Sequence, residues 1–456
     1  MAFLKKAAEK MKDLQSTSIE KFGEAKANSG GAANNQGRFI IRNPVTAQLE
    51  VEGTGEVVRF ASLCAPDLFD SEGFEKEDTM RTIAQFGKWP VTRTYTLKVK
   101  STRIGKGHIN GWDPEVEDFH YDELWLGRHK LGGNFTDLIR HRRGCRRDGG
   151  GQDWWRDEEC LDSMKKIVSF LLNRVNTITG IRIGDDPTIL AFETGNEMNC
   201  GGLRPAPGDW TLEIARHIKN LAPRALVMDG SFAPGITTAM ERNGGLRRMS
   251  RLLGHTARYS SAAYGFFAHA KEFESFLKHC DRHGASGTLA WSLRPHSVKG
   301  GFKTHGEGNE IWSYHAPGWK PTRLPDGHHH EWDHRERDVI RAIRKAAFDL
   351  TNQKPPPIQP NHPPELLLCK DGKGFTWRGV AWADYYELWT SISCEGDQDW
   401  KFFQGGLTDN IKEGHLKYCC NNILKLKNCS TLWIAMRGIS ADKLPGPFSK
   451  PLRIGC

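Results

Sequence analysis

Short apolar runs alternate with longer stretches of helical periodicity over most of the chain. The apolar runs, each short enough for one strand, lie at 57–63, 90–97, 188–193, 225–229 and 287–291. The stretches with helical spacing lie at 79–86, 161–175 and 212–221. This alternation predicts a parallel α/β sheet, and a body of this length suits a (β/α)8 barrel of the TIM-barrel type.

The number of strands falls short of a complete barrel. Residues 115–160 are polar, charged and rich in glycine, although a complete barrel needs a strand there. Between Asp229 and the run at 287–291, only 259–267 has the pattern of a strand. We therefore predict a barrel that lacks one or two β/α units.

Changes of composition divide the chain into four parts. Residues 1–37 form a polar N-terminal extension, 38–353 the barrel, 354–364 a proline-rich linker and 365–456 a tail. The tail has alternating apolar and polar residues at 375–380, 385–390 and 432–437, which predicts a small antiparallel β-sandwich. In this pattern it resembles a fibronectin type III or carbohydrate-module sandwich. Its aromatic residues are expected mainly in the core.

Charge and hydropathy exclude several classes of protein. The net charge of +9 is modest for 456 residues, and acidic residues directly follow the basic cluster at 140–147. This cluster therefore indicates a solvated loop, with nucleic-acid binding as the less favoured alternative. No apolar stretch approaches about 20 residues, so we expect no membrane span.

The ends and the cysteines bear on localisation and cross-linking. Lys5 and Lys6 precede any apolar run that could form a signal peptide, so the expected location is cytoplasmic. The alternative is secretion, if the N-terminus is incomplete or export is unconventional. The 11 cysteines cannot all pair within one chain. The oligomeric state is left open.

A carboxylate and an amide end one of the predicted strands. The sequence 189–199 places Asn196 and Glu197 at the carboxyl end of its strand, where barrel enzymes carry their active sites. A period of two turns Glu193 to the same face as Glu197 but deeper. A buried carboxylate needs a partner, and we predict Arg93 from a neighbouring strand.

The segment 191–197 resembles the acid/base strand of the glycoside hydrolase family 5 endo-β-mannanases. Further segments resemble the same family in the expected order, namely 59–63, 91–95, 228–230 and 287–293. The resemblance covers residues 38–320 and leaves out the tail. It implies a glycoside hydrolase that cleaves β-1,4-mannan by the retaining mechanism, with a polysaccharide or oligosaccharide as substrate.

The resemblance also implies roles for individual residues. Glu197 would be the general acid/base, Asn196 would hold the sugar 2-hydroxyl, and Arg93 would keep the nucleophile ionised. Trp291 would form the platform under the sugar. In the loop after the last strand, His296 and His305 are expected on the substrate rim, with ordinary loop positions as the alternative.

The second carboxylate of a retaining site is missing from its expected position. The family carries its nucleophile in a Glu-Phe-Gly or Glu-Tyr-Gly context, and the matching segment 262–267 has Ala263 in its place. Glu272 and Glu274 lie nearby, but the apolar spacing of 270–278 predicts a helix that turns both to solvent. We therefore expect an impaired hydrolase. The alternative is a carbohydrate-binding pseudoenzyme or a non-functional shortened product.

A histidine-rich segment raises the question of a metal. Residues 328–334 have metal-ligand types, but their spacing matches no standard zinc site. We predict neither a metal nor a cofactor.

Overall fold

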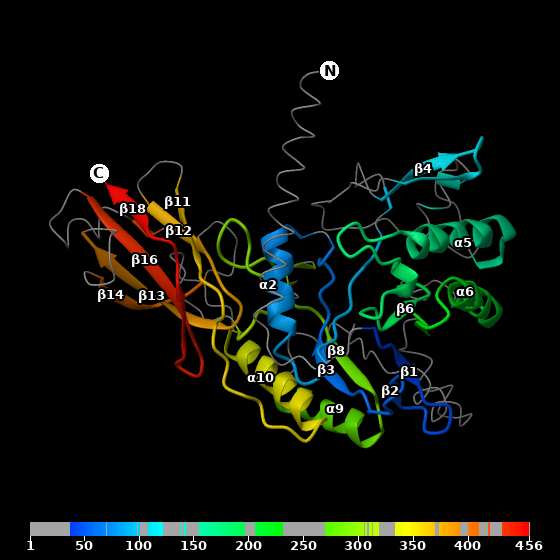
Figure 1. The fold of residues 1–456 in the computed structure, drawn as a ribbon, viewed down its shortest axis with the longest axis horizontal. Coiled ribbons are helices and arrows are strands. Elements are labelled where there is room, and N and C mark those ends of the chain that lie inside the picture. Colours follow the sequence, from blue (N-terminus) through cyan, green and yellow to red (C-terminus); the bar gives the residue numbers. More distant parts are fainter. Residues whose placement is uncertain are drawn as a thin grey trace.

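The computed structural model describes the chain in blocks between residues 37 and 455. These blocks are 37–69, 71–97, 99–100, 108–121, 138, 141–142, 155–196, 206–230, 270–304, 306–307, 310–311, 313–318, 333–369, 374–392, 400–409, 418–419 and 431–455. In Figure 1, helix α2 (Gly73–Ile83) lies between the C-terminal sheets at the left and the parallel strands of the body.

Two pairs of parallel strands form the middle of the body. β3 (Phe60–Leu63) pairs with β8 (Gly287–Ala290), and β6 (Ala191–Glu193) pairs with β7 (Leu226–Met228). β3 is buried along its whole length, as expected for a parallel strand that is covered on both faces. The strands predicted at 57–63, 188–193, 225–229 and 287–291 are therefore confirmed, and each is shorter than predicted.

The strand predicted at 90–97 is not a regular strand. It lies beside the end of β3, where Thr92 Oγ1 donates to the Leu63 carbonyl at 2.8 Å. The Ala65 amide donates to the Arg93 carbonyl at 2.8 Å. One of these two hydrogen bonds comes from a side chain, and together they do not give the repeated backbone ladder of a strand. The β propensity of this run therefore predicted an extended backbone correctly, but the prediction of a strand within a sheet was wrong.

Five helices are described in the body. They are α2, α5 (Glu158–Asn173), α6 (Gly208–Leu221), α9 (Ala270–Arg282) and α10 (Asp333–Asp349). α5 begins where the Asp157 side chain accepts hydrogen bonds from the amides of Glu159 and Cys160, as an N-cap does. The predicted helices at 161–175, 212–221 and 270–278 are confirmed. The one predicted at 79–86 begins and ends earlier, as α2.

Three small antiparallel hairpins complete the body. β1 (Ile40–Arg42) pairs with β2 (Leu49–Val51), and β9 (Gly306–Glu307) pairs with β10 (Glu310–Ile311). β4 (Ile109–Asp113) pairs with β5 (Asp118–Tyr121). β5 lies in the segment 115–160 that we predicted to be without strands. It belongs to a hairpin and does not supply a parallel strand of the body.

The C-terminal region consists of two antiparallel sheets. The smaller sheet has the order β11 (Glu365–Leu368), β12 (Gly374–Arg378), β15 (Tyr418–Cys419). The larger has the order β14 (Lys401–Leu407), β13 (Ala383–Ser391), β16 (Thr431–Ser440), β17 (Pro445–Phe448), with β18 (Leu452–Gly455) also paired to β16.

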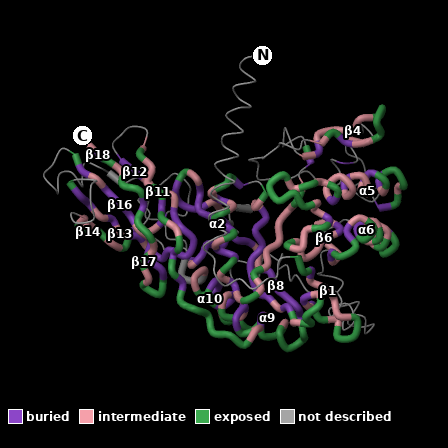
Figure 2. Tube along the Cα trace, viewed as in Figure 1, coloured by how far each residue is buried: buried purple, intermediate pink, exposed green. Residues whose placement is uncertain are grey.

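Both C-terminal sheets contribute to one hydrophobic core. Phe375 and Trp377 come from the smaller sheet, and Tyr386, Leu388 and Met436 from the larger. Figure 2 shows the buried residues along β13 and β16. The alternation at 375–380, 385–390 and 432–437 therefore predicted strands correctly, because each strand turns every second side chain into this core.

The described residues agree with the predicted α/β class, but they do not form a closed barrel. The pairs β3–β8 and β6–β7 are separate sheets in the described part of the chain. The candidate strand at 259–267 lies outside the described residues. Between α10 and β11, residues 350–364 form neither helix nor strand. Among the described helices, none combines the length and hydropathy that a membrane span requires.

Candidate active site

The carboxyl end of β6 is held close to the end of β7. The Thr194 amide donates to the Met228 carbonyl at 3.0 Å, and the Gly230 amide donates to Thr194 Oγ1 at 3.3 Å. A Cβ on Gly230 would lie only 1.8 Å from the Gly195 carbonyl oxygen, so this approach requires glycine. The backbone that carries Asn196 is thereby fixed beside β7.

Arg93 and Glu193 form a bidentate ion pair below this strand end. Arg93 Nε donates to both carboxylate oxygens at 2.8 and 2.9 Å, and Nη2 donates to Oε2 at 2.5 Å. Burial disfavours the charged form of Arg93, but the hydrogen bond and the charge of Glu193 outweigh it and raise the pKa of the guanidinium. The predicted partnership of Glu193 with Arg93 is confirmed.

The same guanidinium orients Asn196. Arg93 Nη2 donates to Asn196 Oδ1 at 2.9 Å, and therefore the oxygen of this amide faces the cation. Both Arg93 and Asn196 are half-buried. A fixed amide next to a fixed cation is the kind of polar arrangement that can recognise the hydroxyl groups of a ligand.

Two aromatic rings extend this polar group toward β8. The Arg93 guanidinium carbon lies 5.5 Å from the centre of the Tyr95 ring. The Tyr95 ring in turn lies 5.9 Å from that of Trp291, which directly follows β8. We name Arg93, Tyr95, Glu193, Asn196 and Trp291 the strand-end cluster. It brings together three residues that we predicted for the site, from three separate segments of the chain.

Tyr95 is the member of the cluster that the sequence analysis missed. Its signal was available, because in an extended segment Arg93 and Tyr95 turn to the same face.

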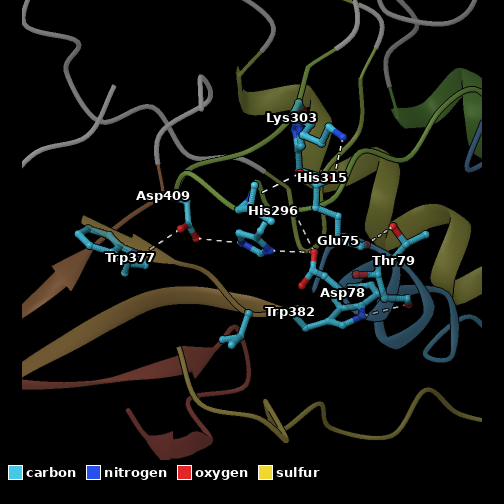
Figure 3. A network of polar contacts seen from close by, with 12 residues as sticks. Glu75, Asp78, Thr79, His296, Lys303, His315, Trp377, Trp382 and Asp409 are labelled. Atoms are coloured by element: carbon cyan, nitrogen blue, oxygen red, sulfur yellow. Dashed lines mark hydrogen bonds and ion pairs between the residues drawn. The ribbon is translucent and has the colours of Figure 1, made fainter. Parts of the chain in front are cut away.

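His296 does not lie with this cluster. Its side chain is only 1% exposed and is hydrogen-bonded between Asp78 and Asp409, as Figure 3 shows. A side chain so enclosed does not line an open rim. The prediction of His296 as a substrate-rim residue is therefore corrected. The position of His296 in the loop after β8 predicted a contact with substrate. In the structure, both nitrogens of its imidazole instead contact carboxylates that are distant in sequence.

The remaining predicted residues fall partly outside the described chain. Glu197, His305 and Ala263 are not among the described residues. Glu274 is exposed on α9, as predicted, while Phe273 and Leu277 of the same helix are buried. The strand-end cluster itself contains one carboxylate, that of Glu193, and Arg93 is hydrogen-bonded to it.

Part of the chain matches a protein-family model. Residues 149–278 match the GH family 5 beta-mannosidase-like family. This range contains α5, β6, α6 and β7, and it includes Glu193 and Asn196 of the strand-end cluster.

Similar proteins are found among plant mannanases. The chain is 33% identical over 129 residues to mannan endo-1,4-beta-mannosidase 3 of Oryza sativa subsp. japonica, covering 25% of this chain and 27% of that protein. It is 35% identical over 86 residues to mannan endo-1,4-beta-mannosidase 7 of Arabidopsis thaliana, covering 17% and 19%. The chain thus spans about a quarter or less of the length of these curated relatives. The matched part of the chain is thus similar to glycoside hydrolase family 5 mannanases.

Among solved structures, the endo-beta-1,4-mannanase from Thermotoga petrophila matches with 14% sequence identity and a TM-score of 0.42, covering 86% of this chain and 98% of that one. The endo-1,4-beta-mannanase from Rhizomucor miehei matches with 17% identity and a TM-score of 0.41, covering 56% and 90%.

Proposed function

We propose that this chain binds β-1,4-mannan-type polysaccharide at the strand-end cluster and is a glycoside hydrolase with low turnover. The observation that supports this most strongly is that Arg93 contacts Asn196 directly and reaches Trp291 through the Tyr95 ring. The resemblance to family 5 mannanases independently implies a place in the sugar site for Arg93, Asn196 and Trp291.

Each described group has a matching task on a sugar. A flat indole such as that of Trp291 presents an apolar face to the C–H groups of a pyranose ring. Asn196, oriented by Arg93, supplies a fixed hydrogen-bonding group for a hydroxyl. Arg93 and Glu193 compensate each other's charge, so the pair keeps its geometry when a neutral ligand displaces water.

The proposal extends to the fold. We infer that the pairs β3–β8 and β6–β7 are two parts of a reduced (β/α)8 barrel, with the C-terminal sheets as a β-sandwich beside it. In such a barrel the ends of β6 and β8 face the same opening, which suits their shared place in one cluster.

The proposed chemistry is the retaining double displacement. Glu197 would protonate the glycosidic oxygen as the sugar–oxygen bond breaks, while a carboxylate on the opposite face of the ring would form a glycosyl ester. Ala263 stands where the resemblance places that carboxylate, so the ester cannot form there. Glu193 is a poor substitute, because Arg93 hydrogen-bonds both of its oxygens.

A carbohydrate-binding protein without hydrolytic activity is the second candidate. The exposed position of Glu274 on α9 favours it, because this carboxylate is turned away from the buried side of its helix. Both candidates share the saccharide site and differ in turnover.

Rescue by a small anion distinguishes them. The purified chain is given an aryl β-mannoside with a good leaving group, with and without azide. Azide would attack the anomeric carbon from the face opposite the aryl group, releasing the phenol and forming α-mannosyl azide. Formation of this product supports a hydrolase that lacks its nucleophile. Binding of mannohexaose without any azide product supports the binding protein, and no binding contradicts both.

Glu197 is tested by the substitution Glu197→Gln on an unactivated β-mannan oligosaccharide. We expect residual turnover to fall by roughly 10²–10⁴-fold with nearly unchanged binding, because the change removes proton donation and keeps the shape. The control is Glu274→Gln, the same change on the exposed face of α9. Undiminished turnover in Glu197→Gln would remove Glu197 from the mechanism.

A further inference from the structure

His296 lies between carboxylates from two distant parts of the chain. Its backbone amide and its Nδ1 contact Asp78 Oδ2 of α2 at 2.9 and 3.0 Å, and its Nε2 contacts Asp409 Oδ2, just after β14, at 3.2 Å. We name Asp78, His296 and Asp409 the interface triad. Its three side chains are 2%, 1% and 4% exposed, so water has almost no access to them.

Asp409 is itself anchored in the C-terminal sheets. Its Oδ1 accepts a hydrogen bond from Trp377 Nε1 of β12 at 3.0 Å, and its Oδ2 accepts one from the Tyr386 hydroxyl of β13 at 2.7 Å. Both donors belong to the core that the two sheets share. The carboxylate that reaches His296 is therefore placed by the C-terminal region (Figure 3).

The contact between the loop after β8 and the C-terminal sheets is tight. A Cβ on Gly379 would lie 2.2 Å from the His296 ring, and a Cβ on Gly300 would lie 2.6 Å from Thr376 Oγ1. Arg378 Nε also donates to the Val298 carbonyl at 2.7 Å. The backbone at both glycines thus lies so close to the neighbouring region that a side chain would not fit.

The loop that carries His296 begins at Trp291 of the strand-end cluster. Between the two residues, the Leu293 amide donates to the Cys64 carbonyl at 2.8 Å and the Arg294 amide donates to the Tyr314 carbonyl at 2.9 Å. Beyond His296, the Lys303 amide donates to the Pro295 carbonyl at 2.9 Å. The loop is thus fixed at the end of β3 on one side and at the triad on the other.

The triad carries a permanent charge on His296 at neutral pH. Burial opposes the imidazolium, but the charges of Asp78 and Asp409 and their hydrogen bonds outweigh it and raise the pKa of His296 to about 10. Two further described side chains surround this charged group. The Tyr386 hydroxyl contacts Asp409, and the Phe302 ring stacks on the imidazole with centroids 4.2 Å apart.

We propose that Asp409 is a positioning residue that acts through His296 to hold Trp291 in place for the saccharide. The C-terminal sheets are then an integral part of the sugar site and are not a separately moving module. The statement about Trp291 rests on the proposed function, whereas the coupling between Asp409 and the loop at 291–304 stands on its own contacts.

The test compares two carboxylate-to-amide variants of the full chain. Asp409→Asn keeps the shape of the side chain and removes its charge. The control Glu387→Gln changes a carboxylate of the same sheet that pairs with Arg437 at the other face of β13. Amide hydrogen exchange is followed in peptides covering 291–304, and affinity is measured with β-1,4-mannohexaose.

We expect about tenfold faster exchange at 291–304 in Asp409→Asn and no change there in Glu387→Gln. Mannohexaose should bind roughly tenfold more weakly to Asp409→Asn alone. If Asp409→Asn does not fold, Trp377→Phe takes its place, because it removes only the indole donor to Asp409 and keeps a ring in the core. It should show the same pattern with smaller changes.

The outcomes separate the two proposals. If amide hydrogen exchange at 291–304 is unchanged in Asp409→Asn, the coupling is overturned at any affinity for mannohexaose. Faster exchange with unchanged affinity overturns the positioning of Trp291. If the wild-type chain does not bind mannohexaose, the proposed function and the role of Trp291 both fail, and the exchange result then decides whether Asp409 holds the loop.

Discussion

The strand-end cluster and the interface triad both hold a cation next to carboxylates, but in different surroundings. In the cluster, the side chains of Arg93 and Glu193 are 13% and 19% exposed, and an amide and two rings continue the arrangement. In the triad, His296 is 1% exposed and both of its ring nitrogens contact carboxylates of the protein. The cluster is therefore partly accessible to a ligand, whereas the triad is enclosed and joins two regions of the chain.

This difference bears on stability as well. A buried charge that loses its partner has no water to replace it, so breaking the triad should cost more than breaking a half-buried pair. The cluster can tolerate change at a smaller cost, because solvent reaches it and screens the unpaired charge.

The largest effect is expected for His296→Ala. This substitution leaves Asp78 and Asp409 facing a buried cavity, and we expect the free energy of unfolding to fall by about 3–5 kcal/mol. Urea unfolding measures it, with His283→Ala as the control, since His283 is exposed at the end of α9. Equal stability losses in both variants would mean that the triad does not join the two regions.

The pH dependence of the free energy of unfolding tests whether the interface triad is stabilised by a charged His296. Since the pKa of His296 is raised to about 10 in the folded chain, its ionisation stabilises the fold fully below the unfolded value of about 6.5. This contribution of a few kcal/mol is lost as the pH rises from about 6.5 through about 10. Urea unfolding across this range should show a steeper decline for wild type than for His296→Gln, and parallel curves would contradict the charged imidazole.

A smaller effect is expected for Arg93→Met in the cluster. Glu193 loses its bidentate partner while it is only partly exposed, so we expect a loss of about 1–3 kcal/mol in the free energy of unfolding. The control is Arg341→Met, which breaks an exposed pair with Asp338 on α10 and should cost less than about 1 kcal/mol. A loss in Arg93→Met as large as in His296→Ala would remove the contrast between the two sites.

The cluster was more accessible to sequence reasoning than the triad. Arg93 could be assigned to Glu193 because the period of a strand placed a carboxylate inward, and a buried charge requires a partner. The partner of His296 could not be found in this way. Asp78 lies on a helix and Asp409 more than a hundred residues further along the chain, and only packing of the two regions brings them together.

The fold shows the same limit of local patterns. The alternation at 385–390 predicted a strand correctly, because one face of β13 packs in the C-terminal core. The run at 90–97 has equal β propensity, yet its neighbours give it only isolated hydrogen bonds to β3. Its state was decided by tertiary contacts that the run itself does not encode.

The most direct test of the saccharide site is calorimetric titration of the full chain with β-1,4-mannohexaose. Wild type should bind, and Trp291→Ala should bind about tenfold more weakly because the ring platform is lost. Trp389→Ala, which removes a half-buried indole from β13 in the C-terminal region, should bind like wild type. Equal affinities of wild type and Trp291→Ala, or no binding by wild type, would contradict the assignment of the strand-end cluster as a sugar site.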